Sequence, residues 1–282
     1  MAEFTCNICG ERCPESVCSS CGATLRDRAI LHVLSNELFG AALTLREFPR
    51  VKSLRGLGTS DSHVYAGRLA EKFDYRNTFY DRPPQLDIAN PPEEEFGQYD
   101  FLISSEVFEH VAPPIERAFQ NAARLLKPNG VLVLTTPYSL ESSTAEHYPD
   151  LHEFGIAQVG ERMVVVNRTR GGELQVFENP VFHLGATGPA LEVREFSESA
   201  LKKLLEGAGF GTVRIYGENY APFGIARNES WSLPIAARKG EFSLGADATR
   251  EIMEHWAELN RSLQRMARTY WFRIGLKLGL LK

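Results

Sequence analysis

Apolar residues recur along this chain with two different spacings, and the spacing changes near residue 50. Between Thr24 and Gly40 the apolar positions recur every three or four residues, which is typical of an amphipathic helix. Thr24 can cap the start of this helix, and Gly40 is placed to end it. We therefore expect a linking helix within residues 24–50.

After residue 50, short apolar runs alternate with amphipathic stretches. The first runs are Val51–Leu57, Val64–Phe73, Tyr75–Tyr80, Phe101–Ser104, Ile115–Leu126 and Val131–Thr135. A further helix is expected from Ser197 or Ser199 to Gly207, followed by strands at Thr212–Tyr216 and Leu233–Ala237. Such alternation predicts an α/β fold with a doubly wound, mostly parallel sheet that helices cover on both faces.

A long insertion, residues 137–195, interrupts the alternation. Within it, Met163–Val166 and Leu174–Phe177 flank Arg170-Gly171-Gly172, which predicts a β-hairpin. Loops of this length in compact domains usually serve as lids or binding segments. We expect the insertion to cover a substrate site within a main domain of residues 51–240.

Four cysteines near the start have the spacing of a metal site. They form two pairs, Cys6-x2-Cys9 and Cys18-x2-Cys21, within a predicted knuckle of residues 1–23. Two such pairs complete a tetrahedral sulfur shell for Zn²⁺, which would be structural because no coordination position stays open. Disulfides and an iron-sulfur cluster compete for the same residues. Cys13 lies between the pairs and is expected to be a loop residue.

Composition and charge narrow the function classes. The net charge of the 282 residues is −5, which gives no general attraction to nucleic acid. No run of about 18 apolar residues predicts a membrane span. Cysteine pairs that no signal peptide precedes favour a cytoplasmic location. A position at the surface of a membrane is compatible with such a location.

The last segment, residues 241–282, is expected to be a helical tail. From Asn260 onward it carries arginines and lysines without an acidic residue, interleaved with aromatic and leucine residues. Such a helix can lie on an anionic membrane surface, pack on its own domain, or form a homodimer. All three interpretations remain open at this point.

A glycine-containing segment follows the first predicted strand. It runs from Ser53 to Asp61, with Gly56 and Gly58 where backbone could approach a ligand beside a helix amino terminus. The full dinucleotide fingerprint is absent, which argues against NAD.

The order of the segments that follow is more specific. Leu86-Asp87-Ile88 comes after the second strand, then Tyr99 to Val111 with Glu106, and then Leu125-Leu-Lys-Pro-Asn-Gly130. This order resembles the class I S-adenosylmethionine-dependent methyltransferases, from about Val51 to Ala237.

Three further segments are similar to one bacterial group of these enzymes. They are Cys18–Arg28, where a cysteine knuckle precedes an arginine-bearing helix, Val181–Phe196 in the insertion, and Ser232–Arg238 in the last strand. Members of this group often accompany glycosyltransferases. The resemblance therefore implies a seven-stranded Rossmann-like sheet, S-adenosylmethionine as methyl donor, and a sugar or glycan acceptor.

The resemblance also assigns residues to the donor site. These are Gly56, Gly58, Asp61, Asp81, Asp87, Ile88 and Glu106. The two glycines would lie at the donor's amino-acid end, with Asp61 near the terminus of the following helix, and Asp87 and Ile88 would lie beside the adenine. Asp81 would bind the ribose hydroxyls, although it can also be a turn residue. Glu106 would face the crevice at the end of the fourth strand.

A general base is expected among the histidines. His183 is the first candidate because it lies in a glycine-bearing loop of the insertion, and His152 and His147 follow. A loop histidine bonded to backbone remains the competing interpretation for each. Arg194 and Glu192 are expected to bind acceptor hydroxyls or to form a salt bridge in the lid.

The leading hypothesis is an enzyme that methylates a hydroxyl of a sugar, glycan or other small molecule, with a histidine as proton acceptor. The first alternative is an RNA methyltransferase that holds its substrate with the zinc knuckle. The second is a non-catalytic member of the fold that acts as an interaction protein.

Overall fold

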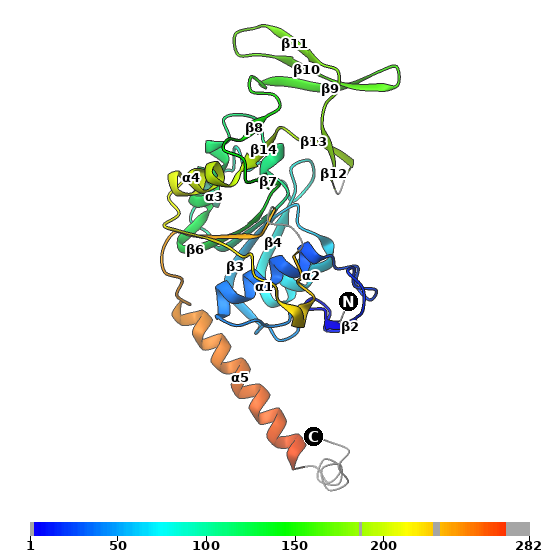
Figure 1. Cartoon of the computed structure of the whole chain (residues 1–282). Coiled ribbons are helices and arrows are strands. Elements are labelled where there is room, and N and C mark those ends of the chain that lie inside the picture. The colour runs from blue at the N-terminus through cyan, green and yellow to red at the C-terminus, as the bar shows by residue number, and fades with distance from the viewer. Residues whose placement is uncertain (1–2, 186–187, 228–231, 269–282) are drawn as a thin grey trace.

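The computed structural model of the chain describes residues 3–185, 188–227 and 232–268. Its centre is a six-stranded sheet in the order β15, β16, β6, β5, β3, β4 (Figure 1). The strands are β3 (Val51–Thr59), β4 (Phe73–Thr78), β5 (Tyr99–Ser105), β6 (Leu126–Thr135), β15 (Thr212–Ile215) and β16 (Ile235–Arg238). β3 pairs in parallel with β4 and β5, and β5 with β6, whereas β16 is antiparallel to both β6 and β15.

The predicted α/β class is correct, but the sheet is mixed and has six strands within the described residues. In the segment between β4 and β5, the described residues form one isolated parallel bridge, between Phe79 and Gln85. Pro83 and Pro84 stand between these two residues and have no backbone N–H to donate to a ladder. A seventh edge strand therefore does not develop there.

Helices cover both faces of the sheet. α1 (Leu25–Phe39) and α2 (His63–Lys72) lie on one face, and α3 (Glu116–Leu125) and α4 (Glu198–Gly207) on the other. In β5, Phe101 and Ile103 face the first layer whereas Leu102 faces the second. This alternation buries the apolar side chains of the strand, as expected for a sheet covered on both sides.

α1 begins and ends where the sequence predicted. The Thr24 hydroxyl accepts a hydrogen bond from the amide of Asp27, the Asp27 side chain accepts from the amide of Thr24, and Gly40 ends the helix with φ 66°. However, α1 is more than a linker, because Ile30, Leu34 and its other apolar residues belong to the same buried cluster as the sheet. The short strands β1 (Phe4–Thr5) and β2 (Arg12–Cys13) precede it.

Gly56 and Gly58 lie inside β3, not in a loop after it. A Cβ atom at Gly56 would come within 2.2 Å of the Phe101 ring, and one at Gly58 within 2.1 Å of the Tyr75 hydroxyl. Internal packing therefore requires both glycines. The turn that follows the strand is shorter than predicted and begins at Ser60.

The predicted turn Lys127–Gly130 also differs. The structure includes these residues in β6, where the pairing with β5 shifts register between Leu126 and Val131. The extra residues form a bulge at the start of the strand, and α3 still ends at Leu125.

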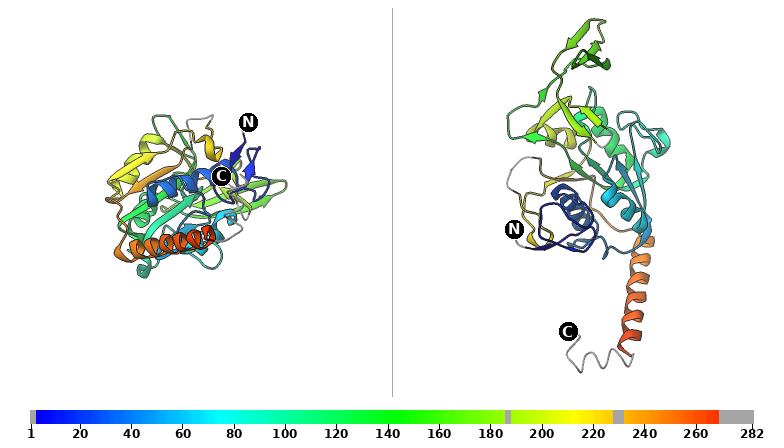
Figure 2. Two further views of the ribbon diagram at one scale, coloured as in Figure 1. Left: turned by 90° about the horizontal axis from the view of Figure 1, so that it is seen from below. Right: turned by 90° about the vertical axis from the view of Figure 1, so that its right-hand side faces the viewer.

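The insertion folds into small sheets beyond the main one (Figures 1 and 2). Its strands are β7 (Tyr138–Ser139), β8 (Ala145–Glu146), β9 (Glu153–Val159), β10 (Arg162–Arg168), β11 (Leu174–Phe177), β12 (Phe182–Gly185), β13 (Gly188–Leu191) and β14 (Arg194–Ser197). The predicted hairpin is confirmed as the antiparallel pair β10 and β11, and β9 extends it. Ser197 caps α4 by accepting from the amide of Ala200.

α5 (Ala246–Ala267) leaves the body of the protein and projects away from it (Figures 1 and 2). The basic residues Arg273, Lys277 and Lys282 of the predicted tail lie outside the described residues. Among the helices that the structure describes, none is both long and apolar enough to cross a membrane.

Candidate functional site

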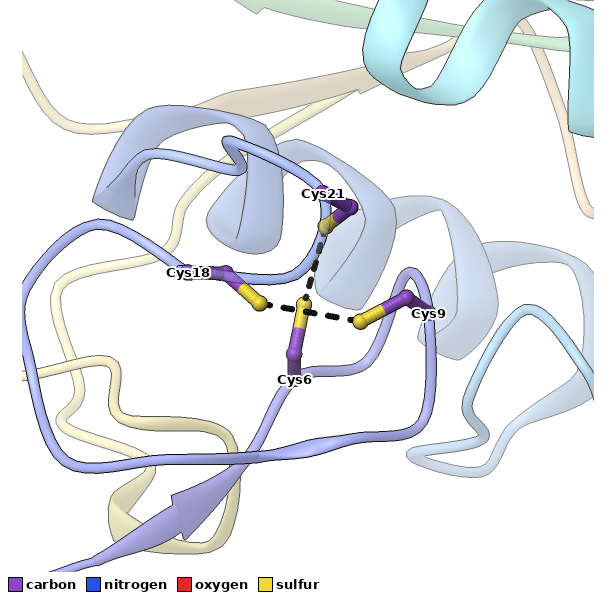
Figure 3. Close-up of side chains that lie close together, drawn as sticks. All are labelled: Cys6, Cys9, Cys18 and Cys21. Atoms are coloured by element: carbon purple, nitrogen blue, oxygen red, sulfur yellow. Dashed lines mark hydrogen bonds between the residues drawn. The ribbon is translucent and has the colours of Figure 1, made fainter.

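The four paired cysteines converge at the amino-terminal end of the chain (Figure 3). Their sulfur atoms all lie within 4.8 Å of one another, with 3.8 Å between Cys6 and Cys21 and 3.6 Å between Cys9 and Cys18. Gly10 and Gly22 follow the two pairs with φ of 78° and 77°, a conformation that suits glycine.

These distances suit a tetrahedral metal centre. Four sulfurs bound to Zn²⁺ at about 2.3 Å lie about 3.8 Å apart, close to the spacing found here. A disulfide would bring two sulfurs to about 2.05 Å, and all five cysteines are free. Burial raises the pKa of Cys6 to about 11, so a cation is needed to hold the thiolate form. Cys13 lies outside the group and donates to the carbonyls of Glu15 and Val17.

Two arginines connect the knuckle to the rest of the molecule. Arg28 is buried and donates to the carbonyls of Ala23 and Phe223 at 2.9 and 3.0 Å. Arg26, two residues earlier on α1, pairs with Glu106 at 3.3 Å. The start of α1 therefore reaches the carboxyl end of β5.

That end of the sheet is its topological switch point. From β3 the chain continues to β4 on one side, and β5 returns on the other side of β3. The residues after β3 and β5, Ser60 and Glu106, have φ of 58° and 54°, which residues with a side chain rarely adopt. Open α/β sheets bind ligands at such a point, and strained backbone is concentrated at functional sites.

The predicted donor residues are distributed unevenly around this edge. Asp61 is buried, its amide donates to Asn77 at 2.9 Å, and its carboxylate accepts from the Tyr75 hydroxyl. Burial raises the pKa of Asp61 to about 8. Asp61 thus fills the space beside Gly58 and supports the turn from within, which adds a structural role to the predicted one.

The other three predicted residues follow β4 in the chain. Asp81 is exposed in the turn after β4. Asp87 accepts from the amide of Ala89 at 2.9 Å, which closes a local turn. Ile88 is buried in the core, and Asn121 of α3 fixes its carbonyl at 3.0 Å.

Glu109 follows Glu106 by three residues and is completely buried. One of its carboxylate oxygens accepts from the Thr136 hydroxyl at 2.9 Å, while the other has no hydrogen-bond partner and lies 3.7 Å from His110 Nε2. Burial, and next the negative charge of Glu106, raise the pKa of Glu109 to about 8. Glu106 also has a buried oxygen without a hydrogen-bond partner. Within the described residues, the edge of the sheet therefore carries two buried carboxyl oxygens that lack a hydrogen-bond partner.

Two of the three predicted catalytic histidines converge on one carboxylate. Glu192 is buried, its Oε1 lies 3.0 Å from His147 Nε2, and its Oε2 contacts His183 Nε2. The His183 side chain is 41% exposed, so part of the ring is open to solvent. A buried carboxylate that orients an exposed imidazole is the arrangement that general bases require.

His110 and nearby backbone join this pair to the edge of the sheet. His110 Nδ1 donates to the carbonyl of Leu191 at 2.8 Å, and the amide of Val193 donates to the carbonyl of Glu109 at 2.8 Å. The rings of His110 and His183 lie 6.2 Å apart. Burial lowers the pKa of His110, so this ring is held neutral.

Of the other two candidates in the insertion, His152 lies away from this pair, and Arg194 forms a salt bridge, the second of the two roles expected for it. The His152 side chain is exposed, and its amide is anchored by Asn167, so it does not join the histidine pair. Arg194 is completely buried, pairs with Glu146 at 2.7 Å and donates to the carbonyl of Val111. It is a structural residue that does not contact acceptor hydroxyls, because no part of it reaches solvent.

Sequence reasoning missed Glu109 and the bridging role of Glu192. A signal for Glu109 was present, because three ionisable residues, Glu106, Glu109 and His110, follow the apolar run of β5 within five positions. The role of Glu192 depends on pairing across 45 residues, between β8 and the end of β13.

Three solved methyltransferase structures match the chain at low identity. The amino pentose methyltransferase CalS10 of Micromonospora echinaspora is 13% identical over 78% of this chain and 93% of its own, with a TM-score of 0.40. The 1,6-didemethyltoxoflavin-N1-methyltransferase of Burkholderia thailandensis is 14% identical over 66% and 70%, with a TM-score of 0.37. The sugar N-methyltransferase KedS8 of a Streptoalloteichus species is 14% identical over 70% and 84%, with a TM-score of 0.38.

No curated protein sequence matches the chain significantly. A family model described as a methyltransferase domain matches residues 58–215, which is more than half of the chain. The match begins within β3, includes the turn at Ser60, β5 and the whole insertion, and ends with β15. The chain therefore belongs to the methyltransferase domain family.

Proposed function

We propose that this protein is an S-adenosylmethionine-dependent methyltransferase that transfers a methyl group to a hydroxyl of a sugar, a glycan or another small hydroxylated acceptor. The family match supports methyl transfer. The choice of acceptor rests on the sequence resemblance to bacterial enzymes that accompany glycosyltransferases. The observation that carries the mechanism is the contact of Glu192 with His183 near the carboxyl end of β5.

The donor is proposed to bind at the switch point between β3 and β5. S-adenosylmethionine carries an ammonium group that can donate hydrogen bonds, so it fits an edge that holds carboxyl oxygens without a protein partner. Glu106 and Glu109 each keep a buried carboxylate oxygen without a protein hydrogen-bond partner in the described part of the chain. Asp81, exposed after β4, would accept from the ribose hydroxyls, and Asp87 and Ile88 would lie beside the adenine.

His183 is proposed as the general base. If the Nε2–H of each imidazole donates a hydrogen bond to Glu192, Nδ1 of both His183 and His147 is the unprotonated nitrogen, which can accept a proton. Of the two side chains, His183 is more exposed, at 41% against 27%. Its Nδ1 is therefore the better placed acceptor for a substrate proton.

The transfer itself is a single displacement. Bound S-adenosylmethionine supplies an activated methyl group on a cationic sulfur. The acceptor oxygen forms a bond to the methyl carbon while the bond from that carbon to sulfur breaks, and the hydroxyl proton passes to His183 Nδ1. The Glu192 carboxylate stabilises the resulting imidazolium of His183, as a carboxylate does wherever it orients a catalytic histidine.

The four cysteines are proposed to hold one structural Zn²⁺. A closed sulfur shell leaves no position for substrate, so its contribution is to the fold. Through Arg26 and Arg28 the knuckle is connected to Glu106 and to the segment that contains Phe223. Loss of the metal is thus expected to affect the edge of the sheet as well as the knuckle.

Methyl incorporation from labelled S-adenosylmethionine into a panel of sugars and glycans tests the proposal. His183→Ala is expected to lower the rate by about 10²–10⁴-fold, the usual contribution of a general base. His152→Ala is the matched comparison, because that side chain lies away from the pair, and its rate should stay near that of the wild type. Equal rates for wild type and His183→Ala would remove the base assignment.

The RNA alternative makes a different prediction. Binding through phosphates would weaken steeply as salt concentration rises. The net charge of −5 does not favour it. Salt-dependent RNA binding, together with methyl incorporation into RNA, would replace the small-acceptor proposal.

A further inference from the structure

Arg26 extends from the first turn of α1 to the carboxyl end of β5. Its Nη2 lies 3.3 Å from Oε2 of Glu106, the residue that follows β5 with a φ of 54°. Burial and the charge of Glu106 raise the pKa of Glu109, and the positive charge of Arg26 acts against them. A guanidinium group therefore lies beside both carboxyl groups at the edge of the sheet where the donor is proposed to bind.

The backbone that carries Arg26 is fixed on both sides. Thr24 caps the helix two residues earlier. Arg28, two residues later, is buried, and its guanidinium donates to three backbone carbonyls, two of them in residues 223–224. The side-chain amide of Asn7, inside the first cysteine pair, donates to the carbonyl of Arg28 at 2.8 Å. The knuckle thus holds the first turn of α1 in place, which sets where the Arg26 side chain begins.

Both members of the pair keep unused hydrogen-bonding capacity. The Arg26 side chain is 53% exposed, and a guanidinium has five N–H donors. In the described part of the chain, Oε1 of Glu106 and Oε1 of Glu109 are buried without a hydrogen-bond partner. An ion pair as exposed as this one contributes little to stability. Stabilisation of the fold is therefore a weak explanation for its position at the switch point.

The amino-acid end of S-adenosylmethionine carries two groups of opposite charge on one carbon atom. Its ammonium group donates hydrogen bonds, and its carboxylate accepts them. The free carboxyl oxygens of Glu106 and Glu109 can accept from the ammonium group, but they cannot bind the carboxylate. An arginine binds a carboxylate through two parallel N–H···O bonds. Arg26 supplies this missing cation beside the two glutamates.

We propose that Arg26 is a donor-binding residue that binds the carboxylate of S-adenosylmethionine and so directs the ammonium group to Glu106 and Glu109. This inference rests on the donor site proposed above. Arg26 lies outside residues 58–215, which the family model matches, so the contact is an addition that the amino-terminal segment makes to the family domain. The cysteine knuckle then has a second role beyond the fold, because it positions the arginine that binds the donor.

Calorimetric titration with S-adenosylmethionine and with decarboxylated S-adenosylmethionine tests the inference. The second compound keeps the sulfonium and the ammonium group but lacks the carboxylate. The zinc-loaded wild type should bind S-adenosylmethionine about 10- to 100-fold more tightly than the decarboxylated compound, the usual effect of a hydrogen-bonded charge. Arg26→Ala should lose this preference. It should bind the decarboxylated compound at least as well as the wild type, because the guanidinium no longer competes for Glu106.

Arg12→Ala is the matched control. Arg12 lies on β2 of the same knuckle, is 80% exposed and pairs with Glu3, so the variant removes the same charge and should keep the preference. Both variants should retain one zinc per chain and the melting temperature of the unliganded wild type, because both side chains are largely exposed.

Three results would overturn the inference and leave the donor site in place. They are a wild type that binds both compounds equally, an Arg26→Ala variant that keeps the preference, and an Arg26→Ala variant that binds both compounds more weakly by the same factor. In the last case Arg26 would act through Glu106 alone. A folded wild type that binds neither compound overturns the proposed function, and this inference with it.

Discussion

The Oε2 atom of Glu192 contacts Nε2 of His183, and this contact joins a buried carboxylate to an exposed imidazole. Glu192 is held from its backbone as well, because its amide donates to the carbonyl of Val181 at 2.9 Å. We therefore treat Glu192 as a positioning residue for the proposed base.

The first prediction concerns Glu192→Gln. Glutamine keeps the shape but has one acceptor oxygen, so one imidazole loses its orientation and the imidazolium loses a negative neighbour. We expect kcat to fall by roughly 10- to 100-fold, less than for removal of the base itself. Glu178→Gln, exposed in the same insertion, is the control, and its kcat should stay near that of the wild type. Initial-rate kinetics measure both variants, and equal kcat values for the two would contradict the assignment.

The second prediction concerns the glycines of β3. Gly58→Ala would place a Cβ atom 2.1 Å from the Tyr75 hydroxyl and 2.4 Å from Asp61 Oδ2. We expect the free energy of unfolding to fall by about 1–3 kcal/mol, as for other overpacked sites. Gly67→Ala, in α2 with open space around it, should instead stabilise the protein by about 0.5–1 kcal/mol. Chemical denaturation of both variants checks this, and similar midpoints would contradict it.

The third prediction concerns the pH dependence of stability. In the folded state the pKa of Glu109 is raised from 4.5 to about 8. Between those values the unfolded chain has released the proton while the folded chain retains it. The contribution of Glu109 is therefore fully present below pH 4.5 and is lost as the pH rises through 8.

Glu109→Gln removes this titration, so the stability of the variant should decline less than that of the wild type over the same window. Denaturant unfolding at several pH values measures the difference. Glu94→Gln, at an exposed position, should follow the wild type. Parallel curves for wild type and Glu109→Gln would show that Glu109 is ionised in the folded protein.

The fourth prediction concerns the metal. Cys18→Ser should release the metal and lower the melting temperature, because three thiolates cannot close the shell. Cys13→Ser should retain one zinc per chain, since Cys13 donates only to backbone carbonyls. Elemental analysis and thermal melting of both variants decide this. A wild type that is folded without metal would contradict a structural role.

The sequence was sufficient to predict those features that depend on residues close together in the chain. The cap at Thr24 and the hairpin around Arg170 form as predicted, and the fourth helix is capped by Ser197, one of its two predicted starts. Each depends on residues a few positions apart, so the sequence states the interaction directly.

Features that depend on distant packing were not accessible in this way. Gly56 resembled a ligand-binding glycine, but the Phe101 ring, 45 residues later, explains why no side chain fits there. Arg194 resembled a substrate-binding cation until Glu146 and the carbonyls around it were seen to enclose the guanidinium. The seventh strand that the family resemblance implied does not form within the described residues. We attribute this to a local feature of the sequence, the two prolines after β4.

Calorimetric titration of the zinc-loaded protein with S-adenosylmethionine measures donor binding itself. We expect saturable binding of one molecule per chain and a matching rise in melting temperature, because the ligand binds only the native state. Asp81→Ala should weaken the binding, whereas Glu94→Ala should not. A folded, zinc-loaded protein that releases no heat and shows no rise in melting temperature would contradict the proposal that S-adenosylmethionine is the methyl donor.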